Sequence, residues 1–467
     1  MMMRVLLLVV FAAAAIAAAV WLAGQAGVVT LRWPGWRADT PAGVLVLAVL
    51  VIAVAAALLY RAWGALRTAP RRLAELRRGR RRRRGYEALT RGMVAVAAGD
   101  VAEARAEARR ADNLLDELPL TMLLSAQAAQ LDGDEAAARK YFAAMLERPE
   151  TEFLGLRGLL LHAGREGDSD AAFRLANRAY RLKPNAPWVL NALFDLQIRK
   201  GEWRQAENVV RRAVRRKVIP RAQGRRRRAI LFHEQSLQAE AAGQGASALE
   251  LSLKAFRLAP GMVEVAARLA SLQTAKGAAR DAMKTIEKAW ARAPHPQLGR
   301  LYAAVRADED ALARVKRFEK LLNLRPDHLE SHAAFAEVAV EAKLWGTARG
   351  HLEKALGNIS DGDAPARIFR MMAALEEAEH DDKQAAEAWL MRAGAAKPDE
   401  VWLCRDCHTQ SLAWTPMCQR CQAFDTLEWL SPSPIGAFIA DTPLGGPAPE
   451  RPELGGGTDV DRPNPER

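Results

Sequence analysis

The chain has 467 residues, of which 50% are hydrophobic and only 6% aromatic, and 68 Lys and Arg against 55 Asp and Glu give a formal net charge of +13. An alanine- and leucine-rich composition with so few aromatic residues favours helices and disfavours a protein built mainly of sheet. The positive excess points to anionic partners unless it is concentrated in one segment, and much of it is.

Two apolar runs lie at the start of the chain. The first extends from Val5 to Leu22 and the second from Ala42 to Tyr60. Each has the ~20 residues that a helix needs to cross the hydrocarbon core of a membrane. We therefore expect residues 1–60 to form a transmembrane helical hairpin. The alternative for the first run is a cleaved signal peptide, because Arg4 precedes it and small residues are frequent in it.

An arginine-rich juxtamembrane segment, residues 61–85, follows the second run. Its densest part is a block of five consecutive arginines: Arg80, Arg81, Arg82, Arg83 and Arg84. Positive charge flanking a span marks the cytoplasmic side, so everything after residue 61 is predicted to be cytoplasmic. The block is expected to contact anionic lipid head groups. Nucleic acid is the alternative partner for such a block, but its place beside a membrane span makes us expect none.

Residues 86–400 repeat with the period of a tetratricopeptide solenoid. Small turn residues are followed five positions later by alanine, and often again after twelve. The turn glycines Gly99, Gly133, Gly167 and Gly201 are spaced by 34 residues, as are Gly243 and Gly277. This is the tetratricopeptide period, with about nine helix-turn-helix units. The alanines are expected where two helices cross closely, and they are Ala104, Ala111, Ala138, Ala172, Ala179, Ala206, Ala213, Ala248, Ala255, Ala282 and Ala289.

The ends of the units agree with this pattern. Pro184, Pro260 and Pro294 each follow the second alanine by five residues, where proline ends a helix. More degraded units are expected around Lys343/Ala348/Ala355 and His380/Ala385. The predicted solenoid binds a protein or peptide segment in its groove.

One interval is irregular. Gly201 and Gly243 are 42 residues apart, eight more than the period, and the excess holds VIPRAQGRRRR, which ends with Arg225–Arg228. An insertion in a solenoid usually forms a loop on one face, so this basic segment is a candidate contact for an acidic partner or the membrane surface. The alternative is a solvated loop followed by a basic helix start.

Enzyme motifs are not apparent, and no catalytic residue is predicted. Gly243–Ala248 matches G-x-G-x-x-A, but it falls at a repeat turn without a preceding strand. His162, His233, His332 and His351 are expected to be surface or packing residues, and Met371-Met372 to be core.

All four cysteines lie within residues 401–431, as two C-x-x-C pairs: Cys404 with Cys407, and Cys418 with Cys421. In a reducing cytoplasm this pattern predicts a tetrathiolate metal site, with zinc as the metal and iron possible in its place. Arg405 and Arg420 are expected to offset its negative charge. Trp402, Trp414, Phe424 and Trp429 are expected to surround the metal, because so small a ribbon cannot bury a core by itself.

The same segment also contains C-x-x-C-H, residues Cys404 to His408, which is the attachment pattern for covalent haem. Covalent attachment normally occurs outside the cytoplasmic membrane, and it would leave Cys418 and Cys421 unexplained. A zinc ribbon or rubredoxin-like module is therefore the preferred prediction. Residues 432–467 are rich in Pro and Gly and are predicted to be a disordered tail.

Two spans, an arginine-rich segment and a tetratricopeptide array resemble the HemY-like family of alphaproteobacteria. The tail WLCRDCHTQSLAWTPMCQRCQAFDTLEW is also similar to the C-terminal ribbon of that family, although RadA repair proteins and LapB adaptors have similar ribbons. LapB adaptors share the repeats as well, but they have one span.

The resemblance implies a bacterial inner-membrane protein that organises enzymes of late haem biosynthesis. The overall prediction is an all-α chain in which a cytoplasmic tetratricopeptide scaffold is tethered to that membrane. Two alternatives stay open. One is a LapB-like adaptor that regulates lipopolysaccharide synthesis through a protease, and the other is a periplasmic haem carrier that uses Cys404, Cys407 and His408.

Overall fold

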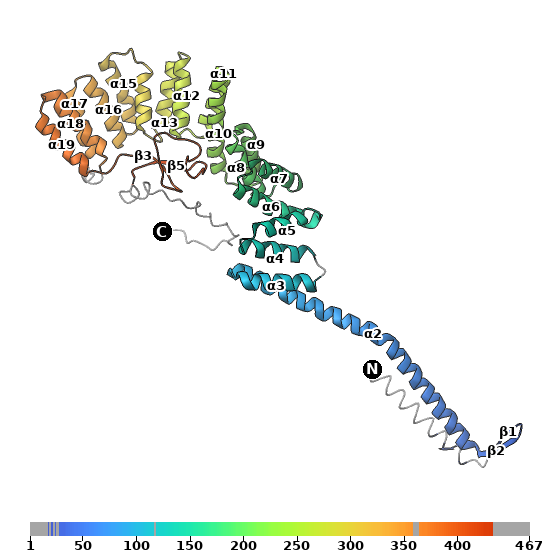
Figure 1. The fold of residues 1–467 in the computed structure, drawn as a ribbon. Helices are drawn as coiled ribbons and strands as arrows, with labels where there is room; N and C mark the ends of the chain where they lie inside the picture. Colours follow the sequence, from blue (N-terminus) through green and yellow to red (C-terminus); the bar gives the residue numbers. More distant parts are fainter. Residues whose placement is uncertain are drawn as a thin grey trace. The chain divides into compact units, whose positions relative to one another are not determined.

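The computed structural model describes residues 28–115, 118–357 and 364–432, together with positions 17, 20, 21 and 24 (Figure 1). The chain divides into two compact units, residues 1–166 and 167–467, and each is described by itself. Apart from three isolated positions, the predicted first span lies outside the described residues, and so does the predicted tail after residue 432.

The first unit opens with a β-hairpin in which β1 (Val28–Trp33) pairs antiparallel with β2 (Trp36–Pro41). The turn between them contains Gly35 at φ 97°, a conformation that glycine adopts without steric cost. We did not predict this hairpin from the sequence and expected a plain connection between two spans. The Pro-Gly pair between two extended stretches is the turn pattern that could have identified it.

Helix α2 (Ala42–Ala98) is a single helix of 57 residues. Its segment Val44–Trp63 is 20 residues long, has a mean hydropathy of 2.7 and is not buried, so by length and composition it is able to cross a membrane. Among the described residues it is the one helix with these properties. It contains most of the predicted second span. The helix then continues without a break through Arg80–Arg84, whose side chains are exposed.

The end of α2 begins the repeat array of the first unit. Its residues Ala88, Leu89 and Ala95 are buried against alanines of the next helix, among them Ala104 and Ala111. The helices that follow in this unit are α3 (Val101–Leu114), α4 (Leu118–Leu131), α5 (Glu135–Met145) and α6 (Pro149–Glu166).

The second unit contains thirteen described helices and a small sheet (Figure 1). The helices are α7 (Ser169–Leu182), α8 (Pro187–Arg199), α9 (Trp203–Arg215), α10 (Arg221–Ala241), α11 (Gly245–Leu258), α12 (Val263–Ala275), α13 (Ala279–Trp290), α14 (Pro296–Ala304), α15 (Ala311–Leu324), α16 (Leu329–Glu341), α17 (Trp345–Leu356), α18 (Ala366–His380) and α19 (Lys383–Ala395). One continuous apolar core extends from Ile230 to Leu375. Layers of paired helices around a shared core are the arrangement expected of a solenoid.

The repeat pattern is confirmed residue by residue. The six turn glycines from Gly99 to Gly277 all have φ between 69° and 78°, the left-handed conformation that ends a helix. The predicted crossing alanines are all exposed by at most 4%. The aspartates after three of the turns cap the helices that follow them, α3, α5 and α7. Each of Asp100, Asp134 and Asp168 accepts a hydrogen bond from a backbone N–H three residues later.

The last predicted unit is displaced by one residue. The left-handed residue is Asp381, at φ 51°, and not His380. Five positions later the buried residue is Ala386, while Ala385 is only partly buried. The unit at Lys343 keeps the predicted register, because Lys343 itself is left-handed and Ala348 and Ala355 are buried.

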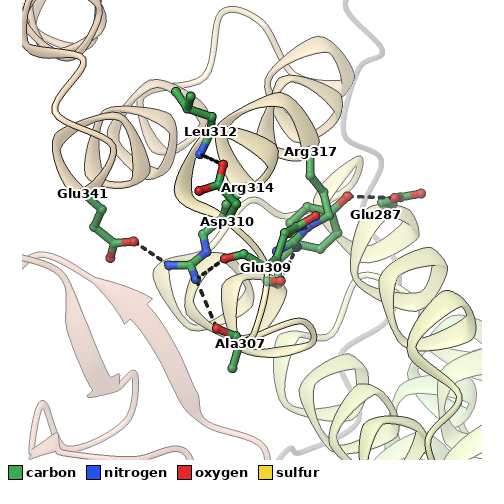
Figure 2. Close-up of polar contacts among 9 residues, drawn as sticks. Glu287, Ala307, Glu309, Asp310, Leu312, Arg314, Arg317 and Glu341 are labelled. Atoms are coloured by element: carbon green, nitrogen blue, oxygen red, sulfur yellow. Dashed lines mark hydrogen bonds and ion pairs between the residues drawn. The ribbon is translucent and has the colours of Figure 1, made fainter.

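A unit without the alanine pattern lies between Gly277 and Lys343, formed by α14 and α15. Its first helix has only nine residues, and Val315 occupies the crossing position where other units have alanine. Polar contacts hold the turn between the two helices (Figure 2). The guanidinium of Arg314 donates to Glu341 at 2.7 Å and to the carbonyl oxygen of Ala307 at 3.4 Å, and Arg317 pairs with Glu309 at 2.7 Å.

The eight-residue excess does not form the loop that we expected. It lengthens α10 to 21 residues, so the alternative of a basic helix start is the one that the structure contains. The added turn packs closely on α9, because a Cβ at Gly224 would lie 2.1 Å from Cγ2 of Val214. Glycine permits this close approach of the two helices.

Candidate functional site

The four-cysteine ribbon contains a three-stranded antiparallel sheet in the order β4-β3-β5. Its strands are β3 (Val401–Cys404), β4 (Gln410–Ser411) and β5 (Leu427–Leu430). Each C-x-x-C pair forms a similar turn. The N–H of His408 donates to the carbonyl oxygen of Cys404 at 2.8 Å, and that of Gln422 to Cys418 at 2.9 Å. His408 and Gln422 also share a left-handed φ, 55° and 56°.

These two turns bring the four thiols together. The Sγ atoms of Cys404 and Cys421 are 3.7 Å apart, those of Cys407 and Cys418 are 3.6 Å apart, and all four lie within 4.8 Å of one another. Four sulfurs at about 2.3 Å from a tetrahedral metal ion would be separated by roughly 3.8 Å. The cysteines are therefore close enough to bind one metal ion. Among the described residues this is the one such group of His, Cys, Asp and Glu side chains.

Hydrogen-bond donors of the ribbon surround the sulfurs. The backbone N–H groups of Arg420 and Cys421 contact the thiol of Cys418, and the N–H of Ala423 contacts that of Cys421. Burial raises the pKa of Cys418 and Cys421, whereas hydrogen bonds from Thr409 and the neighbouring thiols outweigh burial at Cys407 and lower its pKa. The predicted role of Arg405 differs from its contact here, because its guanidinium donates to Glu428 at 3.2 Å.

The aromatic residues of the ribbon have two roles. Trp402, Trp414 and Trp429 pack with the cysteines as predicted. They and Phe424 also contact the helix array, which the sequence did not reveal. Phe424 meets Phe194 of α8 edge to face with ring centroids 5.1 Å apart, and Trp414 meets His233 of α10 at 5.7 Å.

The contacted helices are the first members of successive pairs, and we call the surface of α8, α10, α12 and α14 the first-helix face. His295, at the start of α14, lies against both Trp402 and Trp429, with ring centroids 5.7 Å and 4.5 Å away. The ribbon therefore packs across the first-helix face. It covers part of the solenoid surface, where we expected a partner protein to bind.

The basic segment of α10 contributes to this packing. Arg226 donates two hydrogen bonds to the carboxylate of Asp425 in the ribbon. The guanidinium of Arg227 lies 5.0 Å from the ring centroid of Phe194, and Arg228 pairs with Glu207 of α9 at 2.7 Å. The predicted partner-binding segment thus makes contacts within its own chain.

A pocket of about 690 Å³ lies between the ribbon and the first-helix face. Trp402, Trp414 and Trp429 line one side of it, and His233, Glu264 and His295 line the other. Burial lowers the pKa of each histidine to about 4, with nearby arginines adding to the shift. Burial raises the pKa of Glu264 to about 7. All three side chains therefore tend toward the neutral form.

The remaining histidines and the Met371-Met372 pair were expected to be surface, packing or core residues, and the structure agrees in part. His162 is buried, 3.6 Å from Glu135, and Nδ1 of His332 lies 3.0 Å from Nδ1 of His351. Met372 is buried in the core, while Met371 is partly buried beside it. The G-x-G-x-x-A stretch falls at the turn before α11, with a helix and not a strand preceding it.

Comparisons with known proteins agree with the predicted resemblance. The family model for the HemY protein N-terminus matches residues 27–133, which cover the β-hairpin, α2 and the first repeats. Protein HemY of Escherichia coli K12 is 29% identical over 215 residues, 45% of this chain and 53% of that protein. The aligned region is thus about half the length of that relative. The resemblance to the HemY-like family is confirmed.

A longer alignment is found with the probable magnetosome protein Mms48 of Magnetospirillum gryphiswaldense, which is 27% identical over 447 residues, 92% of this chain and 94% of that protein. Among solved structures, the C-terminal part of a TPR repeat-containing protein from Cytophaga hutchinsonii has 16% identity and a TM-score of 0.31. The match covers 51% of this chain and 94% of that one.

Proposed function

We propose that this HemY-like chain is a membrane-anchored scaffold that holds protein partners on its tetratricopeptide repeats and organises enzymes of late haem biosynthesis. In this proposal residues 1–60 anchor the chain with two spans, residues 86–400 bind partners, and residues 401–431 hold a metal. The scaffold itself performs no catalytic step.

One observation carries the proposal. Helix α2 contains both the apolar segment Val44–Trp63 and the buried residues Ala88 and Leu89 of the first repeat. An uninterrupted helix leaves no flexible linker between the anchor and the array. The rigid part of α2 between Trp63 and Ala88 would set the distance between the bilayer and partners bound to the first repeats. A fixed position near the membrane suits enzymes that handle poorly soluble intermediates.

The arginine block supports a cytoplasmic location for the repeats. Arg80–Arg84 lie in α2 beyond the apolar segment, with their side chains exposed. Positive charge at that end favours retention in the cytoplasm, where the thiols of the ribbon stay reduced. The arginines are then placed to contact anionic head groups of a bacterial inner membrane.

We propose zinc as the ion of the ribbon, bound by Cys404, Cys407, Cys418 and Cys421. The spacing of the sulfurs fits a closed tetrathiolate, which has no open coordination position and is therefore structural. Iron would fit the same four thiols. The convergence of all four sulfurs, together with the exposed side chain of His408, favours this use of Cys404 and Cys407 over haem attachment.

Affinity purification of the full chain from its own membranes in mild detergent tests the function. The proposal expects haem-pathway enzymes to co-purify with the full chain and to be lost from a truncated chain that keeps the Arg80–Arg84 block and ends at residue 85. Recovery of an envelope-synthesis regulator with a protease would support the LapB-like adaptor. A fluorescent protein fused to the C-terminus reports the side of the membrane, because it matures in the cytoplasm.

A further inference from the structure

The pocket between the ribbon and the first-helix face contains unsatisfied polar groups. His233 Nδ1, Glu264 Oε1 and His295 Nε2 are buried atoms without a hydrogen-bond partner among the described residues. Their residues are exposed by only 8%, 9% and 5%. Leaving a buried polar atom without a partner is costly, so three such atoms at one pocket favour a ligand that supplies the missing partners.

These atoms are distributed along the groove. His233 is on α10, Glu264 on α12 and His295 at the start of α14, so they belong to three successive first helices. A ligand that satisfies all three must cross the helices and offer hydrogen-bonding groups along its length. The backbone of an extended peptide does this with its alternating N–H and C=O groups.

A charged group borders the same pocket. Arg300 of α14 is exposed and makes no hydrogen bond or ion pair to any residue in the described ranges. It acts electrostatically on Glu337 of α16, but no hydrogen bond joins them. In contrast, Arg268 at this pocket is held by Glu240 at 2.6 Å. Arg300 is thus available to pair with an acidic group of a ligand.

The hollow continues beyond the tryptophans. A second pocket of about 300 Å³ shares Ser271, Leu301 and Ala304 with the first, and it is lined further along by small apolar residues such as Ala270 and Val305. An elongated hollow with a tryptophan-lined part and a small apolar part suits a chain molecule more than a compact one.

We propose that this composite pocket binds an extended peptide segment of a partner protein, with an acidic residue that pairs with Arg300 and flanking apolar residues that pack on Trp402, Trp414 and Trp429. This inference rests on the proposed scaffold function and adds the chemistry of the segment that the scaffold recognises. Because three tryptophans belong to the metal ribbon, the ribbon is one wall of the binding site and not a separate domain.

The test is selection from a phage library of random peptides of about ten residues against the full-length protein in detergent. The proposal expects enrichment of peptides with Asp or Glu flanked by apolar residues. For an enriched peptide, Arg300→Glu should weaken binding at least tenfold, and changing the acidic residue of the peptide to Lys should restore binding to that variant. A purely structural role of Arg300 would not produce this charge exchange.

Arg280→Glu is the matched control, because Arg280 is also an exposed arginine and lies on α13, away from the pocket. It should leave peptide binding unchanged. Enrichment that ignores the charge at position 300, or binding of oligonucleotides and no peptides, would overturn the inference. Partners that co-purify equally with the wild type and the Arg300→Glu variant would leave the scaffold function standing and remove this site alone.

Discussion

Arg226 of α10 and Asp425 of the ribbon form a two-pronged ion pair, with Nε to Oδ2 at 2.7 Å and Nη2 to Oδ1 at 2.8 Å. The two residues are 199 positions apart in the sequence. The parallel geometry of a guanidinium on a carboxylate fixes orientation as well as distance. The pair therefore fixes the ribbon on the first-helix face in one register.

Removing this ion pair should loosen the ribbon without removing its metal. The Arg226 side chain is 49% exposed, so solvent screening limits the expected loss for Arg226→Gln to about 1 kcal/mol. Hydrogen exchange of residues 401–430 should rise about fivefold. Asp425→Asn should have the same effect, and the double variant should cost little more than either single one.

The neighbouring Arg225 provides the control, because it is exposed and has no ion pair or hydrogen bond among the described residues. Arg225→Gln should leave the exchange of the ribbon unchanged. Equal effects of Arg225→Gln and Arg226→Gln would mean that general positive charge on α10 matters and the specific pair does not.

Loss of one thiol should unfold the ribbon and spare the helices. Cys418→Ser is expected to abolish stoichiometric metal, because a small ribbon depends on its ion for folding, and to open residues 401–431 to protease. Circular dichroism should show nearly unchanged helicity, since solenoid units depend mainly on their neighbours. Ser411→Ala, in the same ribbon but outside the thiol cluster, should keep the metal. Unchanged metal content in Cys418→Ser would contradict the tetrathiolate.

Two glycine substitutions should change stability in opposite directions. Gly224→Ala places a Cβ 2.1 Å from Cγ2 of Val214, so it should destabilise the second unit by about 1–3 kcal/mol despite the better helix propensity of alanine. Gly350→Ala, in α17 with open space around its Cβ position, should stabilise by up to about 1 kcal/mol. Urea unfolding measures both. A neutral Gly224→Ala would mean that α9 and α10 separate easily.

His295 should make the second unit sensitive to acid. Its Nδ1 accepts a hydrogen bond from the N–H of Gln297 at 3.1 Å and caps α14. Burial lowers its pKa from 6.5 to about 4, so the unfolded chain binds a proton more readily than the folded one between those values. Stability should therefore fall as pH decreases from about 6.5 to about 4. His295→Asn keeps a capping oxygen and should reduce the slope of that part of the profile, while His233, whose pKa is lowered in the same way, should maintain the rest. An unchanged slope would contradict the assignment.

The repeats could be predicted because each unit is formed by contacts between residues that are close in the sequence. A turn glycine and an alanine five positions later depend on contacts between two adjacent helices, which recur in the sequence at a fixed period. The predicted position of the last turn was wrong by one residue, because Asp381 replaces the usual turn glycine. The unit of α14 and α15 was not recognised, because Val315 replaces the usual alanine. At Val315 the polar contacts of Arg314 hold a turn that no periodic pattern marks.

Only part of the structure of the ribbon could be predicted from the sequence. The spacing of the cysteines was sufficient to predict four thiols that meet. Its packing on α10 was not predictable, because nothing near Arg226 or Asp425 in the sequence indicates the other. The loop expected from the basic insertion was wrong for a related reason: Arg226 and Arg227 make helix surface that is stabilised by distant partners.

Site-specific photo-crosslinking in living cells tests the scaffold account most directly. A photoreactive residue replaces Leu301, which lines the pocket on the first-helix face, and a control replaces Arg280 on α13. The account predicts discrete adducts with other proteins from position 301, haem-pathway enzymes among them, and none of these from position 280. Absence of any protein adduct from position 301, with crosslinking confined to the chain itself, would contradict it.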